Sequence, residues 1–439
     1  MFNTALTFLY KNIRNRKELA ILNTLKKRSI IDINANVEYQ KQKLTQVLEI
    51  AFRNVPFYKN FASRVNLDSL TYERLQYLPF MDKNQIRKDA KALINPNFDL
   101  KADFARLNSS GGSTGEPVKL YRTGLHSQHG IANYYYALHN NGVSIYQRSI
   151  DLWGAEQDMY RGKSKKGLRQ VLNNNVLLNT FVLSDEIISN YVNQLIAVKP
   201  LFIKAYVHSV YEIAKYILKN NIDVGFSPII HCTTGPLYPE MREVISKAFG
   251  GAYVYNFYGS REVSAIASEV KIASGLYVLY DNVFLEIIDS NGKPVREGEE
   301  GEVVVTTLNN FYMPLIRYRI GDRAIKGDNL NFGTLVLDNV VGRTLGVIHK
   351  RNGSRLDGQF FTTLFFGKEG IKSFQLIQKS LTVLNLKIVK GEQFSEEELY
   401  SILERIECEL GEGIEIEVQF CDKIDLTSTG KIMYVYSEL

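Results

Sequence analysis

Hydrophobic residues recur at helical or strand spacing along most of the chain. Leu44, Val47, Leu48 and Ala51 follow a helical period, and Asn54-Val55-Pro56 is typical of the end of such a helix. From about residue 100 onward, helical stripes alternate with short β-branched runs. This alternation predicts an α/β fold in which helices cover mixed or parallel sheets. The clearest predicted helices cover 210–218 and 241–249, the second closed by Gly250-Gly251, and the clearest predicted strands cover 252–255, 283–288 and 302–307.

The last quarter of the chain has the pattern of a separate small unit. Residues 382–389 predict a strand, and Ser395 with Glu398 has the spacing of a capping box that begins a helix. Strict alternation then predicts a second strand over 414–420. We therefore expect a large N-terminal domain over 1–345, with a mostly helical lead-in over 1–100 and a β-rich subdomain at its end. A small C-terminal α+β lid is expected over 346–439.

Composition agrees with a soluble globular protein of at least two domains. The chain has 439 residues, of which 45% are hydrophobic and 23% charged. A net charge of +6 suits an anionic substrate such as a nucleotide without requiring nucleic acid. The three cysteines Cys232, Cys408 and Cys421 lack any C-x-x-C spacing, which favours a reducing cytoplasm over a disulfide framework. No run reaches the roughly 18 apolar residues of a membrane span.

Residues 1–29 combine apolar side chains with a basic cluster that ends in Lys26-Lys27-Arg28. Two interpretations stay open. The segment is a solvated helix packed on the body of the protein, or it is a basic amphipathic helix that lies on the anionic inner face of the membrane. Whether the protein forms a homodimer also stays open.

A serine- and glycine-rich segment at 108–117 is the first candidate for chemistry. It holds three glycines and four hydroxyl side chains in ten residues, a composition that turns backbone N–H groups toward phosphate oxygens. The P-loop pattern G-x-x-x-x-G-K-[ST] is absent, because Glu116 follows Gly115. Taken alone, the segment is equally compatible with a surface turn. Its candidate phosphate-binding residues are Ser110, Gly111, Gly112, Ser113, Thr114 and Gly115.

Further segments follow in a definite order, and together with this loop they indicate a family. They are Thr233-Thr234-Gly235-Pro236-Leu237, Tyr255-Asn256-Phe257-Tyr258-Gly259-Ser260-Arg261-Glu262, Arg317-Tyr318-Arg319-Ile320-Gly321-Asp322, Gly342-Arg343 and Ser428-Thr429-Gly430-Lys431. In this order the chain resembles the phenylacetate–coenzyme A ligase family of the adenylate-forming superfamily, within its capsule polysaccharide biosynthesis branch. The resemblance runs over nearly the whole chain, from Asn54 to Lys431.

The resemblance implies roles for the first two of these segments. Thr234, Gly235 and Pro236 would line the adenine and acyl pockets. Tyr258 would stack on adenine, and Glu262 would hold Mg²⁺ against the phosphates of ATP, since a hard oxygen ligand suits that ion. The nucleotide-binding set from the second segment also includes Gly259, Ser260 and Arg261.

The later segments complete the implied site. Asp322 would accept both ribose hydroxyls, as a carboxylate can accept two hydrogen bonds side by side. Arg343 would contact the nucleotide near the domain hinge. Lys431 would bridge the substrate carboxylate and the α-phosphate in the transition state, where charge develops.

Several positions depart from the family pattern. Arg261 stands where many superfamily members have threonine, and it favours the capsule branch. Leu345-Gly346 replaces the usual aspartate hinge, and Val118 replaces a lysine after the phosphate loop. Val270 and Tyr277 stand near the places where relatives carry cysteine and histidine ligands, so we expect no structural zinc.

The resemblance therefore implies an ATP- and Mg²⁺-dependent enzyme that activates a carboxylate as an acyl-adenylate. The acyl acceptor stays open between coenzyme A, a carrier-protein thiol, and an amine or hydroxyl of a sugar precursor in capsule or O-antigen assembly. One alternative is a ligase that makes an acyl–coenzyme A from an aryl or acyl acid. An alternative of another class is a non-catalytic nucleotide-binding scaffold.

Overall fold

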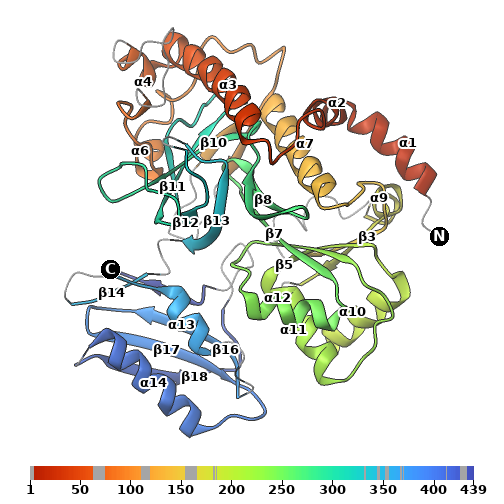
Figure 1. Ribbon diagram of the computed structural model, residues 1–439, viewed down its shortest axis with the longest axis vertical. Coiled ribbons are helices and arrows are strands. Elements are labelled where there is room, and N and C mark those ends of the chain that lie inside the picture. The colour runs from red at the N-terminus through yellow and green to blue at the C-terminus, as the bar shows by residue number, and fades with distance from the viewer. Residues whose placement is uncertain are drawn as a thin grey trace. The chain divides into compact units, whose positions relative to one another are not determined.

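The fold is taken from a computed structural model of the chain (Figure 1). It describes residues 4–62, 75–109, 119–153, 166–180, 183, 185–330, 333–343, 347–351, 355–365, 368, 370–411, 413–425 and 433–439. The chain divides into two compact units. The first comprises Met1–Leu237 and Met241–Val340, and the second comprises Tyr238–Glu240 and Val341–Leu439. The domain boundary expected between 345 and 346 lies outside the described residues.

The described helices of the first unit all end by Ala248. They are α1 (Thr4–Arg14), α2 (Arg16–Leu25), α3 (Ile33–Asn54), α4 (Pro56–Lys59), α6 (Lys83–Lys88), α7 (Gly124–Asn140), α9 (Lys166–Asn173), α10 (Asp185–Val198), α11 (Val207–Lys219) and α12 (Pro239–Ala248). No described helix is both long and apolar enough to cross a lipid bilayer.

An 11-stranded sheet forms the centre of the first unit, in the order β10-β11-β12-β13-β9-β8-β7-β6-β5-β3-β4. Its strands are β3 (Ser149–Trp153), β4 (Asn175–Asn179), β5 (Phe202–Tyr206), β6 (Ile229–Thr233), β7 (Tyr253–Ser260), β8 (Ser264–Val270), β9 (Ala273–Val278), β10 (Val283–Ile288), β11 (Glu300–Thr307), β12 (Tyr318–Lys326) and β13 (Val336–Arg343). Strands β4, β3, β5, β6 and β7 are parallel. From β7 to β8 the pairing becomes antiparallel.

The predicted helix ends agree with the structure. Val55 is extended and Pro56 begins α4, because proline fits the first turn of a helix but not its interior. After α12, Gly250 and Gly251 adopt φ values of +64° and +78°, a conformation that glycine reaches without steric cost. The chain then enters β7, as predicted.

The predicted β-rich part is also confirmed. Strands β10 and β11 pair antiparallel, with Val283 opposite Thr307 and Ile288 opposite Glu302. Every residue of β10 is buried, so this strand is covered on both faces. In Figure 1 these strands lie near α3 and α6, while α10, α11 and α12 gather beside the parallel strands.

Among its described residues, the second unit contains a four-stranded sheet of order β18-β17-β16-β19, two helices and the short pair β14-β15. Its elements are β14 (Val347–His349), β15 (Arg355–Asp357), α13 (Gly358–Phe365), β16 (Ile371–Gln378), β17 (Val383–Lys390), α14 (Glu396–Leu410), β18 (Glu415–Phe420) and β19 (Val435–Ser437). Ser395 is the N-cap of α14, since its Oγ accepts a hydrogen bond from the Glu398 N–H at 3.4 Å, while the Glu398 carboxylate lies 3.2 Å from Lys368 Nζ. Phe420, placed on the buried face by alternation, is 46% exposed because β18 is an edge strand.

The predicted fold class is therefore confirmed. The large unit combines a mixed sheet with covering helices, and the small unit is α+β.

Candidate active site

The serine- and glycine-rich segment joins two strands of an antiparallel hairpin. Strands β1 (Ala105–Ser109) and β2 (Lys119–Thr123) pair so that Ser109 lies opposite Lys119. The two ends of the segment are therefore adjacent, as a closed loop requires. Residues 110–118, which include every predicted phosphate-binding residue from Ser110 to Gly115, lie outside the described residues.

Tyr258 lies where the large sheet changes character. Strand β7 pairs parallel with β6 as far as Asn256 and antiparallel with β8 from Phe257 onward. Ligands of α/β proteins bind beyond the carboxyl ends of parallel strands, because loops and free backbone groups meet there. Tyr258 is only 9% exposed and sits at this edge.

Thr234 lies at the same edge, directly after β6. Its φ is +72°, which is unusual for a β-branched residue because the side chain crowds the backbone. Such strain concentrates at functional sites. Gly235 and Pro236 follow, and the chain then enters α12. The predicted pocket-lining segment therefore leaves the sheet beside the strand that carries Tyr258.

Glu262 lies in the turn between β7 and β8, and three hydrogen bonds hold this turn. Asn108 Nδ2, from β1, donates to the Arg261 carbonyl at 2.7 Å. Ser260 Oγ accepts from the Val263 N–H at 3.2 Å, and Asn282 Nδ2 donates to the Val263 carbonyl at 2.9 Å. The turn is thereby tied to the strand from which the serine- and glycine-rich loop departs.

The Glu262 carboxylate is buried between cations. The residue is 4% exposed, and its Oε1 accepts no hydrogen bond from any described group. Lys83 Nζ, from α6, lies 3.9 Å from the same Oε1. Burial lowers the pKa of Arg122 on β2, and the nearby charge of Glu262 partly opposes that effect. A buried carboxylate with an unused oxygen is available to a ligand of high positive charge.

Asp322 lies on β12 in a bulge. Between the pairs Glu302–Arg323 and Val304–Arg319, one residue of β11 faces Ile320, Gly321 and Asp322 of β12. Gly321 takes a φ of +84° there. Bulges redirect side chains next to functional sites, and this bulge determines where the Asp322 carboxylate points.

The structure brings Tyr258 and Asp322 into direct contact. The Tyr258 hydroxyl donates to Asp322 Oδ2 at 2.7 Å. Strands β8, β9 and β13 separate their two strands in the sheet order. In a flat sheet four spacings of about 4.8 Å would place those strands roughly 19 Å apart. The antiparallel part of the sheet must therefore curve to bring the two predicted nucleotide-binding side chains together.

Besides the phosphate loop, two further predicted residues have no described side chain. Arg343 is the last residue of β13, and Lys431 lies outside the described residues, as does the hinge at 344–346. Conversely, sequence reasoning gave no role to Asn108, Lys83 or Arg122. Asn108 opens the serine- and glycine-rich segment, so its position was a usable signal. Lys83 and Arg122 belong to no motif, and only folding places them near Glu262.

A polar row crosses the parallel strands on one face. Asp151, Lys204, His231 and Tyr255 are successive cross-strand partners on β3, β5, β6 and β7. His231 Nδ1 lies 3.0 Å from the Tyr255 hydroxyl, and burial holds the pKa of His231 well below its usual value. His231 is therefore a neutral histidine of the core.

Comparison with known proteins finds relatives in the family that the motifs indicate. A family model described as the CapK C-terminal domain matches residues 348–438. The protein CapK of Staphylococcus aureus is 24% identical over 93% of this chain and 90% of its own length. The phenylacetate–coenzyme A ligase of Thermus thermophilus is 22% identical over 64% of each chain.

The fold also has a solved counterpart. The crystal structure of 2-hydroxyisobutyryl-CoA ligase in the postadenylation state, in complex with R3-HIB-AMP, superposes with a TM-score of 0.69 at 16% identity. The match covers 94% of this chain and 92% of that chain, and so includes both units. The chain is thus a homologue of CapK and of the phenylacetate–coenzyme A ligases, with the two-domain fold of the adenylate-forming ligases.

Proposed function

We propose that this protein activates a carboxylic acid with ATP, forming an acyl-adenylate and releasing pyrophosphate. The observation that carries the proposal is the Tyr258–Asp322 hydrogen bond of 2.7 Å at the edge of the parallel strands. This contact joins two residues that were assigned to one nucleotide from separate motifs. The buried Glu262, tied through Asn108 to the strand before the phosphate loop, supports the same reading.

In this proposal the nucleotide is held by side chains from four parts of the chain. The ring of Tyr258 stacks on adenine, and the Asp322 carboxylate accepts the ribose hydroxyls. The loop at 110–115 grips the phosphates, and Arg343 contacts the nucleotide near the hinge. Thr234, Gly235 and Pro236 border the adenine and acyl groups, next to Gly259, Ser260 and Arg261.

Glu262 fits the Mg²⁺ that such a reaction uses. Its buried Oε1 is free of hydrogen bonds from described groups. No three His, Cys, Asp or Glu side chains cluster for a metal in the described ranges. A single carboxylate with phosphate oxygens and water is, however, a common way to hold this ion. When bound, the ion neutralises phosphate charge, and Lys83 and Arg122 would add positive charge on the same side.

The chemical step forms one bond and breaks one. A carboxylate oxygen of the acid attacks the α-phosphorus, and the bond from that phosphorus to the bridging oxygen of pyrophosphate breaks. The electron pair leaves with pyrophosphate. Lys431 stabilises the charge that develops on the α-phosphate, so positioning and electrostatics supply most of the rate.

The acyl group then passes to an acceptor. CapK matches nearly the whole chain, which supports a role in surface polysaccharide assembly, with an amine or hydroxyl of a sugar precursor as acceptor. The phenylacetate–coenzyme A ligase relative and the solved coenzyme A ligase favour the alternative, in which the acceptor is the thiol of coenzyme A. We place both reactions in the cytoplasm, where ATP is available.

The test is acid-dependent ATP–pyrophosphate exchange with a broad panel of acids and amino acids. In the presence of at least one acid, the wild-type protein is expected to transfer label from pyrophosphate into ATP. Lys431→Ala and Glu262→Ala are expected to lose exchange by about 100-fold or more, the usual effect of removing a group that stabilises transition-state charge. Two matched controls, Lys423→Ala and Glu297→Gln, change exposed residues and are expected to exchange as wild type does. Adding coenzyme A to the active mixtures separates the two acceptor classes.

The rival of another class makes a different prediction in the same samples. A nucleotide-binding scaffold would be stabilised by ATP against thermal unfolding, yet would exchange no pyrophosphate with any acid. Exchange in Lys431→Ala and Glu262→Ala at the wild-type rate would likewise exclude the proposed chemistry.

A further inference from the structure

Helix α1 carries a row of large apolar side chains that stay exposed. Leu6, Leu9 and Ile13 are 40%, 60% and 80% exposed. Their spacing of three and four residues places them within about 60° of one another around the helix axis. Exposed single hydrophobic residues are ordinary, but a contiguous apolar row indicates a surface that is buried against something else.

The flank and the opposite side of the same helix are attached to the protein. Asn12 Nδ2 donates to the Tyr146 hydroxyl at 3.1 Å, and Lys11 Nζ donates to the Ile145 carbonyl. At the junction with α2, Asn15 Nδ2 donates to the Tyr135 hydroxyl at 2.9 Å. These bonds hold the helix in one rotation about its axis, so the apolar row faces outward as part of the fold.

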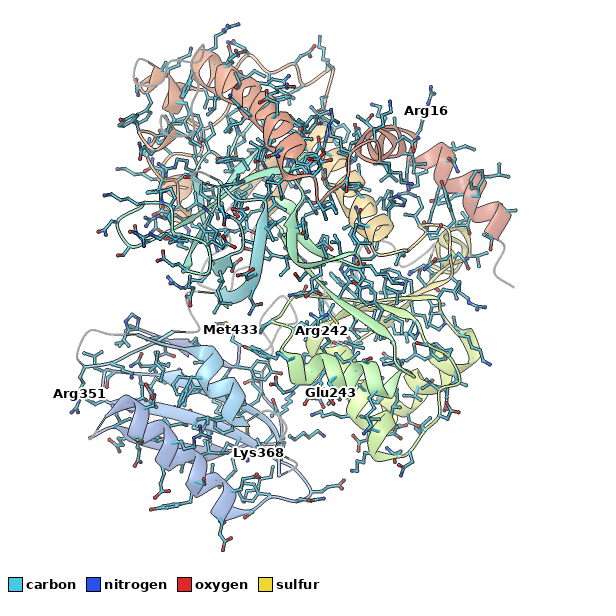
Figure 2. The ribbon with its side chains drawn as sticks, in the orientation of Figure 1. Arg16, Arg242, Glu243, Arg351, Lys368 and Met433 are labelled. Carbon is cyan, nitrogen blue, oxygen red and sulfur yellow. The ribbon has the colours of Figure 1, made fainter. Side chains whose placement is uncertain are left out.

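Positive charge borders the row. Arg14, Arg16 and Lys17 are exposed beside it, and none makes an ion pair with a carboxylate in the described chain. Figure 2 shows Arg16 at the start of α2, its side chain directed away from the neighbouring ribbon. Further along, Lys26 and Lys27 are also exposed. Helices with this combination lie in the interface of anionic membranes, with apolar side chains among the acyl chains and basic ones at the headgroups.

We propose that the α1–α2 face, defined by Leu6, Leu9, Ile13, Arg14, Arg16 and Lys17, binds the surface of an anionic phospholipid bilayer. Charge complementarity selects this partner, because three exposed cations border the apolar row and Glu18, in the first turn of α2, is half-buried. Such a surface matches anionic headgroups above acyl chains. The inference goes beyond the proposed function and does not depend on it. It adds the membrane interpretation of the N-terminal segment to the packing of that segment on the body of the protein, which the bonds to Ile145, Tyr146 and Tyr135 show.

The experiment is sedimentation of the full-length protein with sucrose-loaded vesicles. Wild type is expected to pellet with vesicles of equal parts phosphatidylglycerol and phosphatidylcholine, but not with phosphatidylcholine alone. Binding should weaken as salt is raised, since salt screens exposed charges. Arg16→Glu/Lys17→Glu and Leu9→Asp/Ile13→Asp are each expected to lower the partition coefficient by about tenfold or more, because both apolar contact and charge contribute.

Matched controls change the same chemistry elsewhere. Leu201→Asp/Ile272→Asp alters two residues that are 56% and 66% exposed, and Lys101→Glu/Lys423→Glu makes the same net-charge change at exposed sites. Both are expected to bind vesicles as wild type does, and thermal melting checks that all variants fold. The proposal is wrong if wild type stays in the supernatant, or if the α1–α2 variants bind unchanged. It is also wrong if light scattering shows that Leu9→Asp/Ile13→Asp converts a dimer to a monomer, since the face would then bind a second copy.

Discussion

The Tyr258 hydroxyl and the Asp322 carboxylate form a hydrogen bond of 2.7 Å although their strands are not neighbours in the sheet. Both residues are buried, at 9% and 6% exposure. A hydrogen bond to a charged acceptor in such surroundings is stronger than one in water. The contact therefore orients both side chains before any nucleotide binds.

The first prediction separates the structural and nucleotide-binding parts of this pair. Tyr258→Phe keeps the ring but removes the donor, so the free energy of unfolding in urea should fall by about 1–2 kcal/mol while ATP affinity changes little. Asp322→Ala removes the proposed ribose acceptor, and the KM for ATP in the exchange assay should rise by about tenfold or more. Tyr253→Phe is the control. Tyr253 lies on the same strand as Tyr258, and its hydroxyl donates to Asn141 at 2.9 Å. An unchanged KM for ATP in Asp322→Ala would contradict the proposal that Asp322 binds the ribose.

The second prediction concerns Gly259, next to Tyr258. A Cβ at this position would lie 2.9 Å from the carbonyl oxygen of Ser264, closer than real Cβ atoms approach. Gly259→Ala should therefore destabilise the protein by about 1–3 kcal/mol, as overpacking does. A Cβ at Gly235 would meet nothing closer than 3.7 Å. The free energy of unfolding of Gly235→Ala should therefore lie within about 0.5 kcal/mol of the wild-type value. Equal melting temperatures for the two variants would contradict this steric account.

The third prediction distinguishes Arg317 from Arg319, which are separated by one residue in the same motif. Arg317 is 1% exposed and donates to both oxygens of Glu286, at 3.2 and 2.9 Å, and to the backbone carbonyl of Leu78 at 2.9 Å. Arg317→Met would leave a buried carboxylate without its partner, and should cost about 3–5 kcal/mol of unfolding free energy.

Arg319 is the matched control for Arg317. Its side chain is 38% exposed and lies 3.6 Å from Glu302. Because partly exposed pairs contribute little, Arg319→Met should cost about 1 kcal/mol or less. Urea unfolding of both variants measures the difference, and similar losses would show that the buried pair has no special role.

The fourth prediction is a pH dependence centred on Asp281. Its Oδ1 accepts from Lys43 Nζ and from the Tyr39 hydroxyl, both at 2.7 Å, while Oδ2 lies 2.6 Å from His129 Nδ1 and 2.8 Å from Asn133 Nδ2. Burial alone would raise the pKa of Asp281, but Lys43 and His129 hold it well below its ordinary value. The unfolded chain titrates near 3.9. The carboxylate therefore stabilises the fold fully above about pH 5, and this contribution is lost as the pH falls through 4 and below.

Asp281→Asn tests that dependence. At neutral pH it should lower the free energy of unfolding by about 3 kcal/mol, because it breaks a buried ion pair. The gap from wild type should narrow below about pH 4, because the unfolded wild-type chain then takes up a proton at this carboxyl group while the folded state keeps the charge. Asp422→Asn changes an exposed acid and should follow wild type at every pH. A gap that stays constant with pH would show that the loss comes from packing.

Sequence patterns determined the elements and the classes of residue in this protein. The ends of α3 and α12, the β10–β11 pair and the serine N-cap of α14 follow from local rules of proline, glycine, alternation and capping. The order of motifs likewise marked Tyr258, Glu262 and Asp322 as candidate site residues, because a family motif is read from residue types and spacing alone.

Only the tertiary structure decided which of these residues meet. The Tyr258–Asp322 contact needs a curved sheet and two bulges, and the surroundings of Glu262 need Lys83, Arg122 and Asn108 from three separate elements. No local pattern encodes such contacts, because they depend on how strands distant in sequence are ordered and bent. The same holds for α1, whose composition showed an apolar and basic segment. Its bonds to Ile145, Tyr146 and Tyr135 determine which face points outward.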